Sequence, residues 1–150
     1  MAINKGIAMK RNSALPVEGV ESYEANDREE YMNNAQQEHF RQVLSAWKRS
    51  LMQEADRTVR NMRIDETHLS DPSDRATKEE EFALELRTRD RERKLIRKID
   101  KTLRKLKDDE YGYCEACGIE IGLRRLEVRP TAALCIDCKT TQEIKERQLG

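Results

Sequence analysis

The chain has 150 residues, the length of one domain or of a small domain that carries an appendage. Charged residues make up 39% of it and the apolar set only 37%, with 5% aromatic residues, so it is too poor in core formers for a compact β-sandwich. The 29 basic and 29 acidic residues cancel to a net charge of +0. The total charge therefore predicts no bulk attraction to nucleic acid or to an anionic membrane.

The N-terminal residues carry little pattern. Residues 1–11 are basic but lack the apolar centre of a signal peptide, and no part of the sequence has the run of about 18 apolar residues that a transmembrane helix needs. We therefore expect a cytoplasmic protein with no membrane association. Residues 1–32 are expected to be partly disordered or to pack on the globular end of the molecule.

Residues 33–107 have the pattern of two long helices. Between Val20 and Tyr111 there is no glycine and one proline, Pro72, which predicts two helices and one turn. Asn33 or Asn34 is expected to cap the first helix. Each predicted helix carries an apolar stripe whose positions are mostly three or four residues apart, and charged residues 87–94 interrupt the second stripe. The positions are Phe40, Leu44, Trp47, Leu51, Ala55, Thr58 and Met62 in the first stripe, and Phe82, Leu86, Ile96, Ile99, Leu103 and Leu106 in the second. Two such stripes predict an antiparallel coiled-coil hairpin.

The turn of this hairpin is predicted at 69–77, and it is acidic. Asp74, or Asp71 followed by Pro72, is expected to cap the second helix. Residues 65–81 carry a net charge of −5, whereas residues 87–107 carry +8. An acidic tip on a rigid arm is repelled by nucleic acid and attracted to a basic channel or a bound metal ion. Asp71 and Asp74 either reach a Mg²⁺ through water or serve only as turn and cap residues.

Residues 108–150 form the predicted globular end. The four cysteines, Cys114, Cys117, Cys135 and Cys138, make two C-x2-C pairs 17 residues apart, the spacing of a structural four-cysteine zinc site. Two disulfides or a redox pair are the alternatives, and cytoplasmic residence disfavours disulfides. Four thiolates leave zinc no open position for catalysis, and no catalytic motif is present, so we expect no enzyme. His39 and His68 are expected to be solvent or packing residues, and a helix over about 139–149 closes the chain.

The tip at 71–76, the charged run at 85–94, the segment 111–114 and the second cysteine pair occur together in an order that resembles the DksA family. The resemblance covers roughly residues 21–150. It implies a mainly α fold with a zinc finger and a transcription factor that binds RNA polymerase directly. Such proteins insert the coiled coil into the secondary channel without binding promoter DNA, and they act with ppGpp to repress ribosomal RNA promoters and activate amino-acid biosynthesis promoters.

The same resemblance assigns roles to individual residues. It implies that Asp71, Asp74 and Ala76 form the functional tip and that Arg91 contacts the polymerase. The residues implied to bind ppGpp together with polymerase are Leu95, Lys98, Arg129 and Lys139. Basic side chains suit a polyphosphate, and Leu95 would pack. We expect a monomer with structural zinc.

Two other classes of function compete with this interpretation. A zinc-ribbon nucleic-acid-binding protein would use the +8 segment to follow phosphates and would bind DNA with a steep salt dependence. A thiol-based redox or chaperone protein would release zinc on mild oxidation and gain activity. A Gre-type cleavage factor also carries an acidic coiled-coil tip, but it lacks the four-cysteine module.

Overall fold

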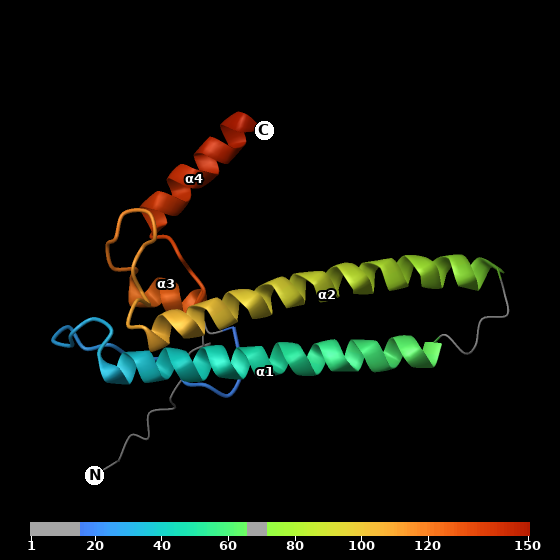
Figure 1. Cartoon of the computed structure of the whole chain (residues 1–150), viewed down its shortest axis with the longest axis horizontal. Coiled ribbons are helices and arrows are strands. Elements are labelled where there is room, and N and C mark those ends of the chain that lie inside the picture. Colours follow the sequence, from blue (N-terminus) through green and yellow to red (C-terminus); the bar gives the residue numbers. More distant parts are fainter. Residues whose placement is uncertain (1–15, 66–71) are drawn as a thin grey trace, which may run out of the picture.

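The computed structural model describes residues 16–65 and 72–150 of the chain. In these ranges it contains α1 (Asn34–Asp65), α2 (Pro72–Lys107), α3 (Leu123–Val128) and α4 (Ile136–Leu149). α1 and α2 run antiparallel and side by side as a long hairpin, with α3 beside its base and α4 projecting from the globular end (Figure 1). At about 1.5 Å per residue, the 32 residues of α1 and the 36 of α2 span about 48 and 54 Å. The predicted mainly α fold with a long helical hairpin is confirmed.

The two long helices begin differently. The Asn33 Oδ1 atom accepts a hydrogen bond from the Gln36 backbone N–H at 2.9 Å, so Asn33 is an N-cap as predicted. α2 begins at Pro72, and the prediction of a turn that continues to Thr77 is wrong because proline is suited to the first helical position. Asp74 lies inside the first turn of α2 rather than capping it. The alternative cap, Asp71, lies outside the described residues.

The core lies at the base of the hairpin, where both helices meet the globular end. Phe40, Leu44 and Ile99 have no exposed surface. The buried cluster also contains Met32, Leu106, Tyr111, Cys114, Ile121, Leu126 and Cys135. Farther along α2 the same stripe becomes exposed, with 43% of Phe82 and 41% of Leu86 accessible to solvent. Among the side chains that the structure describes, the predicted stripe is therefore a closed core only at the base of the hairpin.

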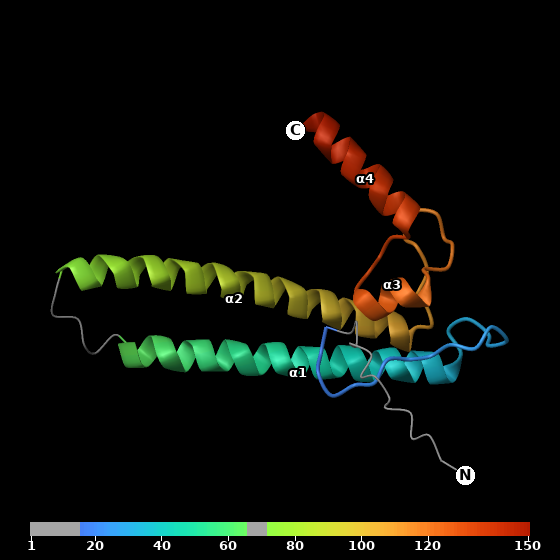
Figure 2. The ribbon, with the colours of Figure 1, turned by 180° about the vertical axis from the view of Figure 1, so that it is seen from behind.

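Two tyrosines hold the chain around this base. The Tyr31 hydroxyl donates to the carbonyl oxygen of Gly112 at 2.7 Å and contacts that of Ile121, and the Tyr111 hydroxyl donates to the carbonyl oxygen of Pro130 at 2.8 Å. Gly112 has a φ of +95°, a conformation that favours glycine. The segment before α1 first runs along the hairpin and then loops out beyond the start of α1 (Figure 2).

The globular end contains one helix that the sequence pattern did not predict. α3 has six residues, too few for a recognisable apolar period. α4 begins at Ile136, three residues before the predicted start, because it starts directly after Cys135 at the second cysteine pair. The described residues form no β-strand; an isolated antiparallel bridge joins Tyr113 and Glu120. No helix in the described ranges is long and apolar enough to cross a membrane.

Candidate metal centre and functional surfaces

The four cysteines meet in one cluster at the globular end. The Sγ atoms of Cys114, Cys117, Cys135 and Cys138 all lie within 4.8 Å of one another, and those of Cys117 and Cys135 are 3.8 Å apart. Four sulfurs at about 2.3 Å from a tetrahedral zinc ion would be about 3.8 Å apart. The sulfur arrangement and the all-thiol donor set therefore fit a structural Zn²⁺ ion held by these four residues.

The backbone around each cysteine pair explains how the pairs form. In the first, Gly118 has a φ of +79° and its N–H donates to the Cys114 carbonyl oxygen at 2.9 Å. In the second, Cys135 is the N-cap of α4, and its sulfur accepts from the Cys138 N–H at 3.4 Å. The Glu115 N–H donates to the Ala133 carbonyl oxygen at 2.8 Å and so joins the two pairs. Each pair thus places two sulfurs on one side of the site.

The thiols differ in how readily they ionise. Backbone N–H donors, above all that of Cys135, lower the pKa of Cys114 to about 6. Hydrogen bonds with the neighbouring thiols raise the pKa of Cys138 to about 12, and the hydrogen bond with Cys135 has the largest effect. Adjacent thiolates repel one another, and a bound dication would supply the charge that ionises all four. The cluster is therefore suited to holding a cation.

His39 lies apart from the cysteines, in a contact between α1 and the segment around α3. Its Nε2 atom is 2.5 Å from Glu127 Oε1, and the two side chains are 9% and 11% exposed. The ring centroids of Tyr23 and His39 are 5.5 Å apart, and the backbone N–H of Tyr23 donates to Glu127 Oε1 at 3.4 Å. His39 is a packing residue, one of the two expected possibilities, whereas His68 lies outside the described residues. Sequence reasoning missed Glu127, since a single glutamate in a short helix gives no signal of burial.

The described part of the predicted tip, residues 72–77 at the start of α2, lies at the end of the hairpin away from the globular end (Figure 1). Asp74 and Ala76 are exposed in the first turns of α2. Asp71 lies outside the described residues. The structure therefore places two of the three predicted tip residues on an exposed surface at the far end of the arm.

The predicted polymerase contact lies near the middle of α2, and the predicted ppGpp residues lie toward the C-terminal end of α2 and in the globular end. Arg91 and Lys98 are exposed on α2, and Leu95 is half-buried against the core. Arg129 is exposed and follows α3 directly. In α4, Lys139 Nζ lies 3.8 Å from Glu143 Oε1. Among the described residues, no hydrogen bond or ion pair joins Leu95, Lys98, Arg129 and Lys139 to one another.

Comparisons with known proteins agree with this architecture. The family profile "DnaK suppressor protein DksA, N-terminal domain" matches residues 36–106, and "Prokaryotic dksA/traR C4-type zinc finger" matches residues 109–143. The chain is similar to a solved structure, transcription factor DksA2 from Pseudomonas aeruginosa, with a TM-score of 0.73 and 43% identity over 78% of this chain and 90% of that one.

Curated relatives extend over nearly the whole length. The protein named RNA polymerase-binding transcription factor DksA in Escherichia coli K12 is 60% identical over 138 residues, 92% of this chain and 91% of the relative. The protein of the same name in Haemophilus influenzae is 58% identical and covers 92% of this chain and 95% of its own length. With both domains matched and this identity over almost the full length, the chain belongs to the DksA family.

Proposed function

We propose that this chain is a cytoplasmic transcription factor that binds RNA polymerase directly. In this proposal it inserts the tip of its hairpin into the secondary channel and acts with ppGpp to repress ribosomal RNA promoters and activate amino-acid biosynthesis promoters. The observation that carries the proposal is the 60% identity to a relative named RNA polymerase-binding transcription factor DksA, over 92% of this chain. That match includes the arm, the globular end and the cysteine pairs.

The shape of the hairpin supports insertion into a narrow channel. α2 extends for about 54 Å from 36 residues, and its first turns, with Asp74 and Ala76, are separated from the core by most of that length (Figure 1). An exposed carboxylate at the end of a rigid rod meets groups that a globular surface cannot reach. Asp71, Asp74 and Ala76 are proposed as the tip residues that act on the polymerase.

The basic stretch of α2, residues 87–107, supports a second contact nearer the base. Arg91 is exposed there, and it is proposed to contact the polymerase. Lys98, Arg129 and Lys139 supply positive charge for a polyphosphate, and Leu95 is half-buried against the core. These four residues are proposed as the chain's part of a ppGpp site completed by the polymerase.

The zinc finger has a supporting role in this proposal. Its ion would fix the segment that carries Arg129 and the start of α4, which carries Lys139, relative to α2. It would have no open coordination position for a reaction. We propose that the protein acts as a monomer, without sequence-specific DNA contacts and without enzymatic activity. DNA binding with a steep salt dependence would favour the nucleic-acid-binding alternative instead.

Transcription in vitro from a ribosomal RNA promoter tests the proposal. Wild type is expected to repress, more deeply with ppGpp, and Asp74→Asn is expected to bind polymerase but lose repression. Glu81→Gln is the matched control, since it removes a negative charge from an exposed position of the same helix. No repression by saturating wild type, or equal loss in both variants, would contradict the proposed role of the tip.

A further inference from the structure

The segment before α1, residues 16–33, contacts the loop that carries the first cysteine pair. The Tyr31 hydroxyl donates to the carbonyl oxygen of Gly112 at 2.7 Å and also contacts that of Ile121. Gly112 lies two residues before Cys114, and Ile121 lies four residues after Cys117. The hydroxyl therefore meets both ends of the loop that supplies two of the four metal ligands.

This metal loop, residues 112–121, is closed by two backbone hydrogen bonds. At its ends, the Ile121 N–H donates to the Gly112 carbonyl oxygen at 2.7 Å, and farther in, the Cys114 N–H donates to the Ile119 carbonyl oxygen at 2.8 Å. The first ligand thus belongs to the same set of bonds as the ends of the loop. A group that keeps Gly112 beside Ile121 also keeps Cys114 in its place.

Tyr31 is held in position by α1 and not by the metal loop. The next residue, Met32, has a φ of +51°, which residues other than glycine adopt infrequently. Two side chains of α1 fix this conformation: Gln36 Oε1 accepts from the Met32 N–H at 2.8 Å, and Gln37 Nε2 donates to the Met32 carbonyl oxygen at 2.9 Å. The hydroxyl of Tyr31 is therefore presented to the loop by the hairpin.

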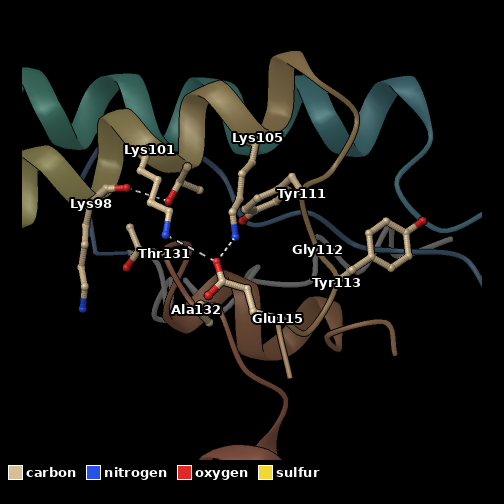
Figure 3. A pocket seen from close by; sticks show the side chains of 11 residues that line it. Lys98, Lys101, Lys105, Tyr111, Gly112, Tyr113, Glu115, Thr131 and Ala132 are labelled. Atoms are coloured by element: carbon tan, nitrogen blue, oxygen red, sulfur yellow. Dashed lines mark hydrogen bonds and ion pairs between the residues drawn. The ribbon is translucent and has the colours of Figure 1, made fainter. Parts of the chain in front are cut away.

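The packing around this hydroxyl leaves little room for movement. A Cβ atom at Gly112 would lie 2.8 Å from the Tyr31 hydroxyl oxygen and 3.0 Å from Met32 Cε. The side chains of Tyr111 and Tyr113 extend to opposite sides of the segment around Gly112 (Figure 3), and the Tyr113 ring meets that of Tyr31 edge-on at 5.9 Å. Movement of the loop away from α1 would break these contacts together.

We propose that residues 16–33 act as a strap on the metal centre, in which Tyr31 is a positioning residue that slows the release of zinc. Tyr31 is not itself a ligand. It acts by holding Gly112 and Ile121 together, and so keeps Cys114 and Cys117 in the arrangement that binds the ion. Groups that orient metal ligands affect how tightly the metal is held. The inference requires the structural zinc ion but no polymerase, so it goes beyond the proposed function.

Transfer of zinc from the loaded full chain to a chromogenic chelator tests this role. Tyr31→Phe removes only the hydroxyl and is expected to raise the rate of zinc release about fivefold, the order expected for loss of one hydrogen bond. Tyr113→Phe is the matched control, since it removes a hydroxyl from a ring that is 41% exposed and lies directly before Cys114. We expect this control to release zinc within about twofold of the wild-type rate.

A second control separates positioning from stability. Val43 of α1 is completely buried, so Val43→Ala is expected to lower the melting temperature at least as much as Tyr31→Phe does. Its zinc release is nevertheless expected to stay within about twofold of wild type. Equal acceleration in Val43→Ala and Tyr31→Phe would show a general effect of stability and would overturn the positioning role.

Zinc is expected in turn to hold the strap, because coupling between two sites is reciprocal. Hydrogen exchange of the Met32 N–H is expected to become faster in wild type when zinc is removed, and to change about fivefold less in Tyr31→Phe. An unchanged rate of zinc release in Tyr31→Phe, or exchange at Met32 that does not respond to zinc in wild type, would overturn the strap. Both failures leave polymerase-dependent repression untouched, so they are distinguishable from a failure of the proposed function.

Discussion

The base of the hairpin and its far end are built from the same two helices, but their side chains serve different purposes. At the base, Phe40, Leu44 and Ile99 are completely buried. Toward the tip, Phe82 and Leu86 are more than two-fifths exposed, and Asp74 and Ala76 are exposed. The comparison teaches that stability is concentrated at the base, while the outer arm gains little from burial and can carry residues chosen for contact with a partner.

Loss of zinc is expected to give the largest effect, since the ion substitutes for a core in the loop-rich globular end. A structural zinc site contributes on the order of 10 kcal/mol, so Cys114→Ser or a strong chelator is expected to unfold residues around the cysteine pairs. Circular dichroism with a zinc assay measures this loss. Ala116→Ser, an exposed substitution between two ligands, is the control. Full zinc content and an unchanged melt in Cys114→Ser would reject the metal centre.

The same substitution at both ends of the hairpin sharpens the comparison. Phe40→Ala is expected to lower the free energy of unfolding by about 3–5 kcal/mol, because it opens a cavity in the closed core. Phe82→Ala is expected to cost less than about 1.5 kcal/mol, since 43% of that side chain is already exposed. Urea denaturation measures both values. Equal costs would show that the outer arm is as tightly packed as the base.

Gly112 and Gly118 both have a left-handed backbone conformation, but an added side chain would be crowded only at Gly112. Substituting each in turn therefore distinguishes the cost of backbone strain from the cost of crowding. A Cβ atom at Gly112 would lie 2.8 Å from the Tyr31 hydroxyl oxygen, whereas one at Gly118 would meet nothing within 4 Å. Gly118→Ala is therefore expected to cost about 1 kcal/mol from its positive φ alone. Gly112→Ala is expected to cost about 1–3 kcal/mol more from overpacking. Thermal melts that rank the two variants in the opposite order would contradict the account of the base.

The smallest effect on stability is expected at the tip. Asp74→Asn replaces an exposed side chain in the first turn of α2, where loss of a favourable dipole contact is worth about 0.3–1 kcal/mol. Urea denaturation of this variant is expected to give a free energy within that margin of wild type. A loss as large as that of Phe40→Ala would make Asp74 a structural residue.

The parts of the fold that could be predicted are those whose residues follow a periodic or local sequence pattern. Phe40, Leu44, Ile99 and Leu106 follow the helix period, and the four cysteines carry the spacing of their shared ligand. The N-cap role of Asn33 followed from side-chain chemistry in the same way. Each of these signals is local or periodic, so it can be read without knowing the tertiary structure.

Contacts between distant segments were not predictable. Tyr31 bonds to Gly112 and Ile121, which are 81 and 90 positions away, and His39 meets Glu127 across 88 positions. The sequence around each residue gives no indication of which distant residue it contacts. The start of α2 at Pro72 was misjudged because Pro72 suits either a turn or the first helical position. The carboxylate of Glu115 meets Lys101 and Lys105 only because the globular end lies against α2.

Site-specific crosslinking from the tip would test the central claim most directly. A photoreactive amino acid in place of Ala76, an exposed residue in the early turns of α2, would be activated in a complex with RNA polymerase and the crosslinked peptides mapped. The account predicts crosslinks to polymerase segments that line the secondary channel, and their loss when unlabelled wild type competes. Crosslinks to promoter DNA alone, or none in a complex that retains bound protein, would contradict it.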